Sequence, residues 1–128
     1  MGTIKRFEDL ECWKRARLLV KIVYTHSRTG RLSRDFGTRD QLCRATLSIM
    51  NNIAEGFARP STKEFIRFLS IAESSASEVK SMCYVLEDLE YLEGPDIQQL
   101  HEEIDTTRKM IKSFIAYLNK YKAEQASK

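Results

Sequence analysis

The sequence predicts an all-α protein folded as an antiparallel, up-down four-helix bundle. Apolar residues recur with the helical period of about 3.6 in four segments, and glycine and proline fall between these segments. No segment alternates apolar and polar residues as a half-buried strand does. Four amphipathic helices with short connections bury their apolar faces against one another as a bundle. We expect a single domain over residues 1–128, because a chain of this length typically forms one.

The first two predicted helices each carry one apolar face. The first face consists of Trp13, Ala16, Val20, Val23 and Tyr24, and the second of Leu42, Ala45, Ile49, Ile53 and Gly56. The second helix is expected to begin at Thr38, because Thr38 and Gln41 match a capping box, in which each side chain bonds the other residue's free backbone N–H. The connection between these two helices, near residues 30–37, is the one expected to be irregular.

The third and fourth predicted helices are longer and contain no glycine or proline after their first turns. Ser61 and Glu64 match a second capping box, and Pro95 suits the first turn of the last helix. The third apolar face consists of Phe65, Phe68, Leu69, Ala72, Ala76, Val79, Met82, Cys83, Leu86 and Leu89. The fourth consists of Ile97, Leu100, Ile104, Ile111, Phe114, Ile115, Leu118 and Tyr121.

Charge is distributed unevenly along the chain. The formal net charge is only +3, yet residues 1–72 carry +7, residues 73–105 carry −9 and residues 106–128 carry +5. Such segregation indicates an anionic partner for the basic surface, or contact between acidic and basic parts within or between subunits. A solvated surface with no partner is the third interpretation.

The motifs of catalysis, metal binding and membrane insertion are absent from the sequence. A di-iron bundle needs Glu-x-x-His on two helices, but neither His26 nor His101 has a glutamate three residues before it. Phosphate-binding glycine loops, the haem-attachment motif and the nucleophile elbow do not occur. The three cysteines are widely spaced, and no apolar run is long enough to span a membrane. We therefore expect a cytoplasmic protein with reduced thiols, no metal, no cofactor, no membrane partner and no enzymatic activity.

A stripe of polar residues flanks the apolar face of the second predicted helix. A stretch of small residues on the third helix contains serines that can hydrogen-bond to it. We interpret the two as a structural polar network between these helices, with Arg44 paired to a carboxylate such as Glu78 or Glu55. Direct ligand binding by the same residues is the alternative. The network is expected to comprise Arg44, Ser48, Asn52, Glu55, Ser75 and Glu78.

Two branched aliphatic residues on the first predicted helix, Leu18 and Ile22, lie outside its main apolar face and one turn apart. They indicate a second contact surface, which we interpret as an oligomer interface. Scattered apolar surface residues are the alternative.

The pattern Q-L-x-R-A-x-x-S-I-x-x-N-I-A-E-G over residues 41–56 resembles the signature of the four-helix-bundle family encoded in 23S ribosomal RNA intervening sequences. The match extends over nearly the whole chain, and one departure is Thr46, where the family more often has alanine. The flanking matches are Phe7, Leu10, Trp13, Arg59, Glu64, Phe65, Phe68, Leu69, Ala72, Ser75 and Glu78.

The resemblance implies a bundle that assembles as a ring-shaped homopentamer. The family is also similar to the accessory protein of diversity-generating retroelements, which binds nucleic acid and a reverse transcriptase through its basic surface. Nucleic acid, with RNA preferred over DNA, is therefore the expected partner.

The predicted nucleic-acid interface lies where the chain termini and the connection between the second and third helices share one end of the bundle. The free N–H groups at the start of the third helix favour a phosphate there. Tyr117 and Tyr121 offer stacking surfaces for single-stranded bases, or else pack in the core or a subunit contact. The predicted contacts are Arg59, Lys63, Arg67, Lys120 and Lys122, with a second basic set at Arg28, Arg31 and Arg34.

Together these observations predict a non-enzymatic, oligomeric nucleic-acid-binding protein. The alternative is a structural scaffold that recruits a protein partner, such as a reverse transcriptase, without contacting nucleic acid itself.

Overall fold

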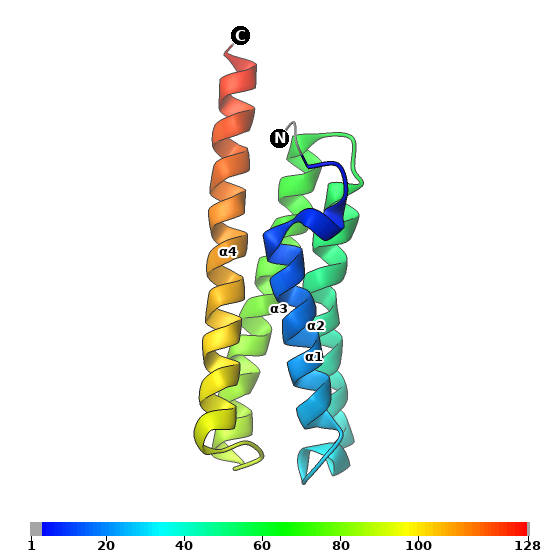
Figure 1. The fold of residues 1–128 in the computed structure, drawn as a ribbon, viewed down its shortest axis with the longest axis vertical. Helices are drawn as coiled ribbons and strands as arrows, with labels where there is room; N and C mark the ends of the chain where they lie inside the picture. The colour runs from blue at the N-terminus through cyan, green and yellow to red at the C-terminus, as the bar shows by residue number, and fades with distance from the viewer. Residues whose placement is uncertain (1–3, 128) are drawn as a thin grey trace.

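A computed structural model describes residues 4–127, which form four α-helices and two short 3-10 turns (Figure 1). Each helix packs against the next one along the chain, and α4 closes the ring by packing against α1. The predicted antiparallel, up-down four-helix bundle is thereby confirmed. The helices are α1 (Glu11–Ser27), α2 (Phe36–Phe57), α3 (Thr62–Asp88) and α4 (Gly94–Ala126), and the 3-10 turns are η1 (Phe7–Asp9) and η2 (Leu32–Arg34).

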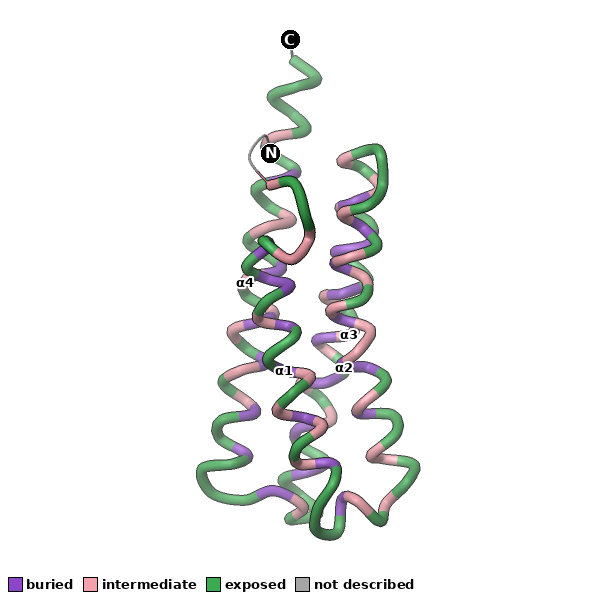
Figure 2. Tube along the Cα trace, turned by 45° about the vertical axis from the view of Figure 1, so that its right-hand side comes forward, coloured by how far each residue is buried: buried purple, intermediate pink, exposed green. Residues whose placement is uncertain are grey.

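The bundle has two distinct ends (Figure 1). The terminal end carries Ile4, Ser127 and the α2–α3 turn at residues 58–61, and the loop end carries the α1–α2 connection at residues 28–35 and the α3–α4 turn at residues 89–93. Helix α4 has 33 residues whereas α1 has only 17, and α4 extends past the other helices at the terminal end. This last part of α4 is largely exposed (Figure 2).

Capping side chains set the starts of α2 and α3. The Ser61 hydroxyl accepts a hydrogen bond from the Glu64 backbone N–H at 3.1 Å, as predicted. Helix α2, however, begins at Phe36, and the predicted start at Thr38 is wrong. Asp35 lies one turn earlier and its carboxylate accepts the Thr38 backbone N–H at 3.2 Å, so that it caps the helix first.

Buried residues alternate with exposed ones along all four helices (Figure 2), and the buried ones form the core between the helices. The predicted apolar faces supply most of this core, although Leu89 is 45% exposed. The hydroxyl of the fully buried Thr46 donates to the Leu42 carbonyl at 2.7 Å, which satisfies it inside the bundle. The largest fully buried side chains are Leu19, Leu32, Leu42, Ile49, Ile53, Leu69, Leu86, Leu100, Ile104, Ile111, Leu118 and Val23.

Helices α2 and α3 approach each other closely at Gly56. A Cβ added there would lie 2.7 Å from Phe68 Cβ and 2.9 Å from Phe65 Cδ1, both well inside van der Waals contact. Only glycine therefore lets the two phenylalanines pack directly against the α2 backbone. This contact fixes where α3 starts relative to the end of α2.

The two connections at the loop end are pinned to each other by Arg31 and Tyr91. The Arg31 Nη2 donates to the carbonyl oxygens of Leu89 and Glu90, each at 3.0 Å, and its guanidinium lies 5.5 Å from the centre of the Tyr91 ring. The Tyr91 hydroxyl in turn donates to Asp35 Oδ2 at 2.8 Å. This hydrogen bond lowers the pKa of the Asp35 carboxyl and raises the pKa of the Tyr91 phenol.

Candidate nucleic-acid interface

Five basic side chains are exposed at the terminal end of the bundle. We call them the basic surface: Arg59 in the α2–α3 turn, Lys63 and Arg67 in the first turns of α3, and Lys120 and Lys122 near the end of α4. Among residues 4–127, none of these five has a carboxylate oxygen within 4.0 Å. Within residues 4–127 these five charges therefore have no ion-pair partner, and they are available to an anion.

Two guanidinium groups of the basic surface lie over one aromatic ring. The Arg59 guanidinium is 4.7 Å and the Arg67 guanidinium 4.6 Å from the centre of the Phe68 ring, which is only 8% exposed. This contact orients each guanidinium while leaving N–H groups at its edge for a phosphate. The N-terminus of α3, with the positive end of its dipole, lies at the same turn.

The second predicted basic set lies at the loop end, where the charges are mixed. Arg31 is bound to the carbonyl groups of the α3–α4 turn, which gives it a structural task. Arg28 and Arg34 are exposed, and neither has a carboxylate within 4.0 Å among the described residues. Exposed acidic side chains near this end of α3 and α4 are Glu87, Asp88, Glu90, Glu93 and Asp96. The terminal end also carries exposed carboxylates, at Asp9, Glu55 and Glu124, but its exposed basic residues outnumber them, so it suits a polyanion better than the loop end.

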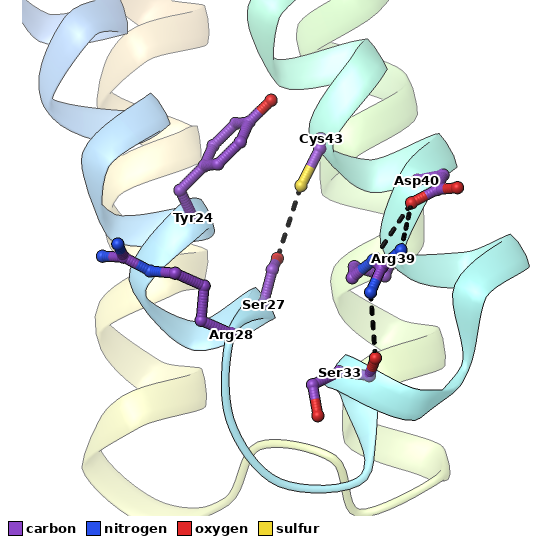
Figure 3. Close-up of a pocket in the computed structure, with 7 residues that line it drawn as sticks. All are labelled: Tyr24, Ser27, Arg28, Ser33, Arg39, Asp40 and Cys43. Atoms are coloured by element: carbon purple, nitrogen blue, oxygen red, sulfur yellow. Dashed lines mark hydrogen bonds and ion pairs between the residues drawn. The ribbon is translucent and has the colours of Figure 1, made fainter.

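A cavity of about 420 Å³ between the end of α1 and the start of α2 is a site that the sequence did not indicate (Figure 3). Its Arg39 donates to Asp40 Oδ1 and to the Ser33 carbonyl, both at 3.0 Å. Arg28 extends to the side of Tyr24, away from Arg39, Asp40 and Ser33. Arg39 therefore adds little free positive charge to the cavity, whereas Arg28 has no carboxylate within 4.0 Å among the described residues. Its lining consists of Tyr24, Ser27, Arg28, Ser33, Arg39, Asp40 and Cys43.

The three cysteines are free, and they differ in accessibility. Burial raises the pKa of Cys12 and of Cys83 to about 12, so neither forms a thiolate near neutral pH. Cys43 is half-buried, lines the cavity of Figure 3 and lies 3.5 Å from the Ser27 hydroxyl.

The polar network between α2 and α3 is smaller than predicted. The Ser48 and Ser75 hydroxyl oxygens lie 2.9 Å apart, and Asn52 Nδ2 donates to the Ser48 carbonyl at 2.8 Å and to its hydroxyl at 3.0 Å. Together these three half-buried residues form the network that the structure shows.

The expected ion pair of Arg44 with Glu78 or Glu55 does not form among residues 4–127. Arg44 and Glu55 are both exposed. Gln41, about one turn before Arg44, takes the place of the arginine and donates a hydrogen bond to Glu78.

The two candidate interface residues on α1 differ in exposure. Leu18 is 41% exposed, whereas Ile22 is half-buried and packs against the core, which corrects the prediction that it lies outside the apolar face. Both residues line a groove of about 350 Å³ between α1 and α4. The oligomer interface remains a prediction.

A charged cluster across α3 and α4 was also missed from the sequence. Lys80 Nζ lies 2.9 Å from His101 Nδ1 and 3.1 Å from Asp105 Oδ2, and His101 Nε2 lies 3.0 Å from Glu87 Oε1. Within residues 4–127, no three His, Cys, Asp or Glu side chains form a group able to hold a metal ion.

None of the helices within the described part of the chain combines the length and apolar character needed to cross a membrane.

These observations define a four-helix bundle whose basic surface, at one end, has no ion-pair partner within residues 4–127. The chain belongs to the family described as 23S rRNA-intervening sequence protein, whose sequence model matches residues 8–113. A crystal structure of a protein of unknown function, from the S23 ribosomal protein family of Bacteroides thetaiotaomicron, is similar with a TM-score of 0.74 and 24% sequence identity. The similarity covers 81% of this chain and 97% of that chain, and it shows the fold. No curated protein matches the chain.

Proposed function

We propose that the protein is a non-enzymatic RNA-binding module and that the basic surface at the terminal end holds the RNA backbone. The observation that carries this proposal is the group of five exposed cations without a carboxylate partner among residues 4–127. RNA is preferred over DNA here by resemblance to the family, whose description refers to an intervening sequence of 23S rRNA and names no ligand.

Phosphate contacts supply most of the binding free energy in this proposal. Each Lys or Arg that neutralises a phosphate releases a condensed counterion, so affinity falls steeply as salt rises. Arg59 and Arg67 are held against Phe68 before RNA arrives, which reduces the conformational freedom lost on binding. Their planar N–H groups suit bidentate contact with phosphate oxygens.

Charge reversal at the α2–α3 turn tests the proposal. We expect Arg59→Glu with Lys63→Glu to weaken RNA binding by at least about tenfold in a gel shift at low salt, because two phosphate contacts become repulsive. The matched control is Arg28→Glu with Arg34→Glu at the loop end, which changes the net charge equally. Circular dichroism should show both variants folded. Equal loss in both pairs, or no loss in the first, would contradict a specific role of the basic surface.

We also propose that the protein acts as a homo-oligomer, a pentamer by resemblance to its family, with Leu18 in the contact. Segregated charge supports association of unlike surfaces, because heterologous contacts close into rings when the rotation permits. Light scattering at low and at high salt tests this assembly. A monomer under both conditions would refute it.

A scaffold that recruits a protein partner is the second candidate function. It is favoured by the exposed apolar side chains Val85 (41%) and Leu89 (45%) near the C-terminal end of α3. A protein that co-purifies after nuclease treatment, together with no RNA binding by the pure chain, would support the scaffold over the RNA module.

A further inference from the structure

A continuous series of aromatic rings crosses the bundle near the terminal end. Phe57 of α2 contacts Phe65 of α3 edge to face at 5.9 Å between ring centres, and Phe65 contacts Phe114 of α4 in the same way at 5.5 Å. Phe114 then stacks on Tyr117, with ring centres 6.2 Å apart and planes inclined by 20°. The series therefore begins among packed helices and ends at the surface.

Tyr117, the last ring of the series, is 50% exposed although it belongs to a packed aromatic cluster. Its contact with Phe114 limits the orientations of the ring. A ring already held in place loses little freedom when another flat group stacks on it. Tyr117 is thus a rigid and accessible stacking surface.

A positive charge accompanies this ring. Lys120 follows Tyr117 by three residues, which places the two on neighbouring positions of the α4 surface. Lys120 is exposed, and no carboxylate lies within 4.0 Å of it among residues 4–127. The pair belongs to the C-terminal part of α4, which extends past the start of α1 at the terminal end (Figure 1).

We infer that Tyr117 stacks on an unpaired base of single-stranded RNA while Lys120 contacts an adjacent phosphate. This inference rests on the proposed function and narrows its ligand to the single-stranded form. Aromatic platforms beside a cationic track bind single strands because every base has a flat face, whereas a duplex keeps those faces stacked inside.

Fluorescence anisotropy with a labelled single-stranded RNA and with its duplex tests the inference on the full-length chain. We expect Tyr117→Ala to weaken single-strand binding by about 30-fold, the middle of the range for one stacked base, and to leave duplex binding unchanged. Tyr117→Phe should retain wild-type affinity, because it keeps the ring. The matched control is Tyr84→Ala, which removes an equally exposed ring (52%) from the acidic part of α3.

Four results would overturn the inference. If Tyr117→Ala leaves single-strand binding unchanged, or weakens single-strand and duplex binding equally, stacking by Tyr117 is wrong although the RNA-binding proposal stands. If Tyr117→Ala lowers the oligomer mass in light scattering but not RNA affinity per chain, the ring belongs to a subunit contact. If the wild-type chain binds neither RNA, the inference falls together with the proposed function.

Discussion

Replacing Gly56 by alanine tests the packing that positions the basic surface. The new Cβ would meet Phe68 Cβ at 2.7 Å, Phe65 Cδ1 at 2.9 Å and the Phe65 carbonyl oxygen at 3.3 Å. Two of these atoms are fixed directly to the α3 backbone. The clash is therefore relieved only by moving α3 away from α2.

The expected magnitude is a balance of two opposite effects. Gly56 lies in the last turn of α2, so alanine is favoured over glycine there by at most the value for a helix interior, about 1 kcal/mol. Overpacking of a core contact costs ~1–3 kcal/mol, and we take the upper end because two contacts fall below 3.0 Å. The net result is a loss of about 2 kcal/mol in the free energy of unfolding, or roughly 8 °C in Tm for a chain of this size.

Urea denaturation followed by circular dichroism measures the effect, and Gly37→Ala is the matched control. Gly37 lies in the first turn of α2, and a Cβ added there comes no closer than 4.0 Å to Asp35 Oδ1. We expect Gly37→Ala to be neutral or stabilising by up to about 1 kcal/mol. If Gly56→Ala is as stable as Gly37→Ala, the close approach of α2 and α3 at Gly56 does not constrain the fold, and the reasoning fails.

Three further predictions concern the loop end and the thiols. Glu90 has a left-handed φ of 55°, which glycine adopts without strain, so Glu90→Gly should raise the free energy of unfolding in urea by about 1 kcal/mol. The control Asp88→Gly, in the last turn of α3, should lower it. A loss of stability in Glu90→Gly would show that the backbone at Glu90 is not strained. The Tyr91 hydroxyl lowers the pKa of the Asp35 carboxyl in the folded protein. The ionised carboxylate therefore stabilises the fold fully at pH values above the ordinary aspartate pKa near 4. This stabilisation is lost as the pH falls through the lower pKa that Asp35 has in the folded state. The stability difference between wild type and Tyr91→Phe should therefore shrink between about pH 7 and about pH 2, and a constant difference would show that Asp35 is not the partner. Cys43 should react first with a thiol reagent, because burial raises the pKa of both other thiols to about 12; equal rates for all three by mass spectrometry would refute this.

Local signals in the sequence were sufficient for the helices and for most of the core. The spacing of Leu42, Ile49 and Ile53 depends only on the helical period, and all three are buried as that period requires. The start of α3 at Ser61 was predictable for the same reason, because a cap involves residues within one turn. The start of α2 was not predictable in this way, because Asp35 and Thr38 lie within one turn and both are residue types that cap helices.

Contacts between distant residues account for what the sequence did not predict. Arg31 was taken for a free cation, but its partners lie on a turn 58 and 59 residues later in the chain. The contact of Arg59 with the Phe68 ring likewise depends on how α2 and α3 meet around Gly56. Helical periodicity places a side chain on one face of its helix, but it does not specify which long side chain contacts a residue on the neighbouring helix. For that reason Gln41, rather than Arg44, bonds Glu78.

The salt dependence of RNA binding tests the central claim most directly. Five phosphate contacts by the basic surface predict that the logarithm of the association constant falls with the logarithm of salt concentration, with a slope of about −3.5 for single-stranded RNA. Removing two of these contacts in Arg59→Ala with Lys63→Ala should reduce the slope to about −2. An affinity that does not change with salt, or a slope that is the same in both proteins, would contradict the account.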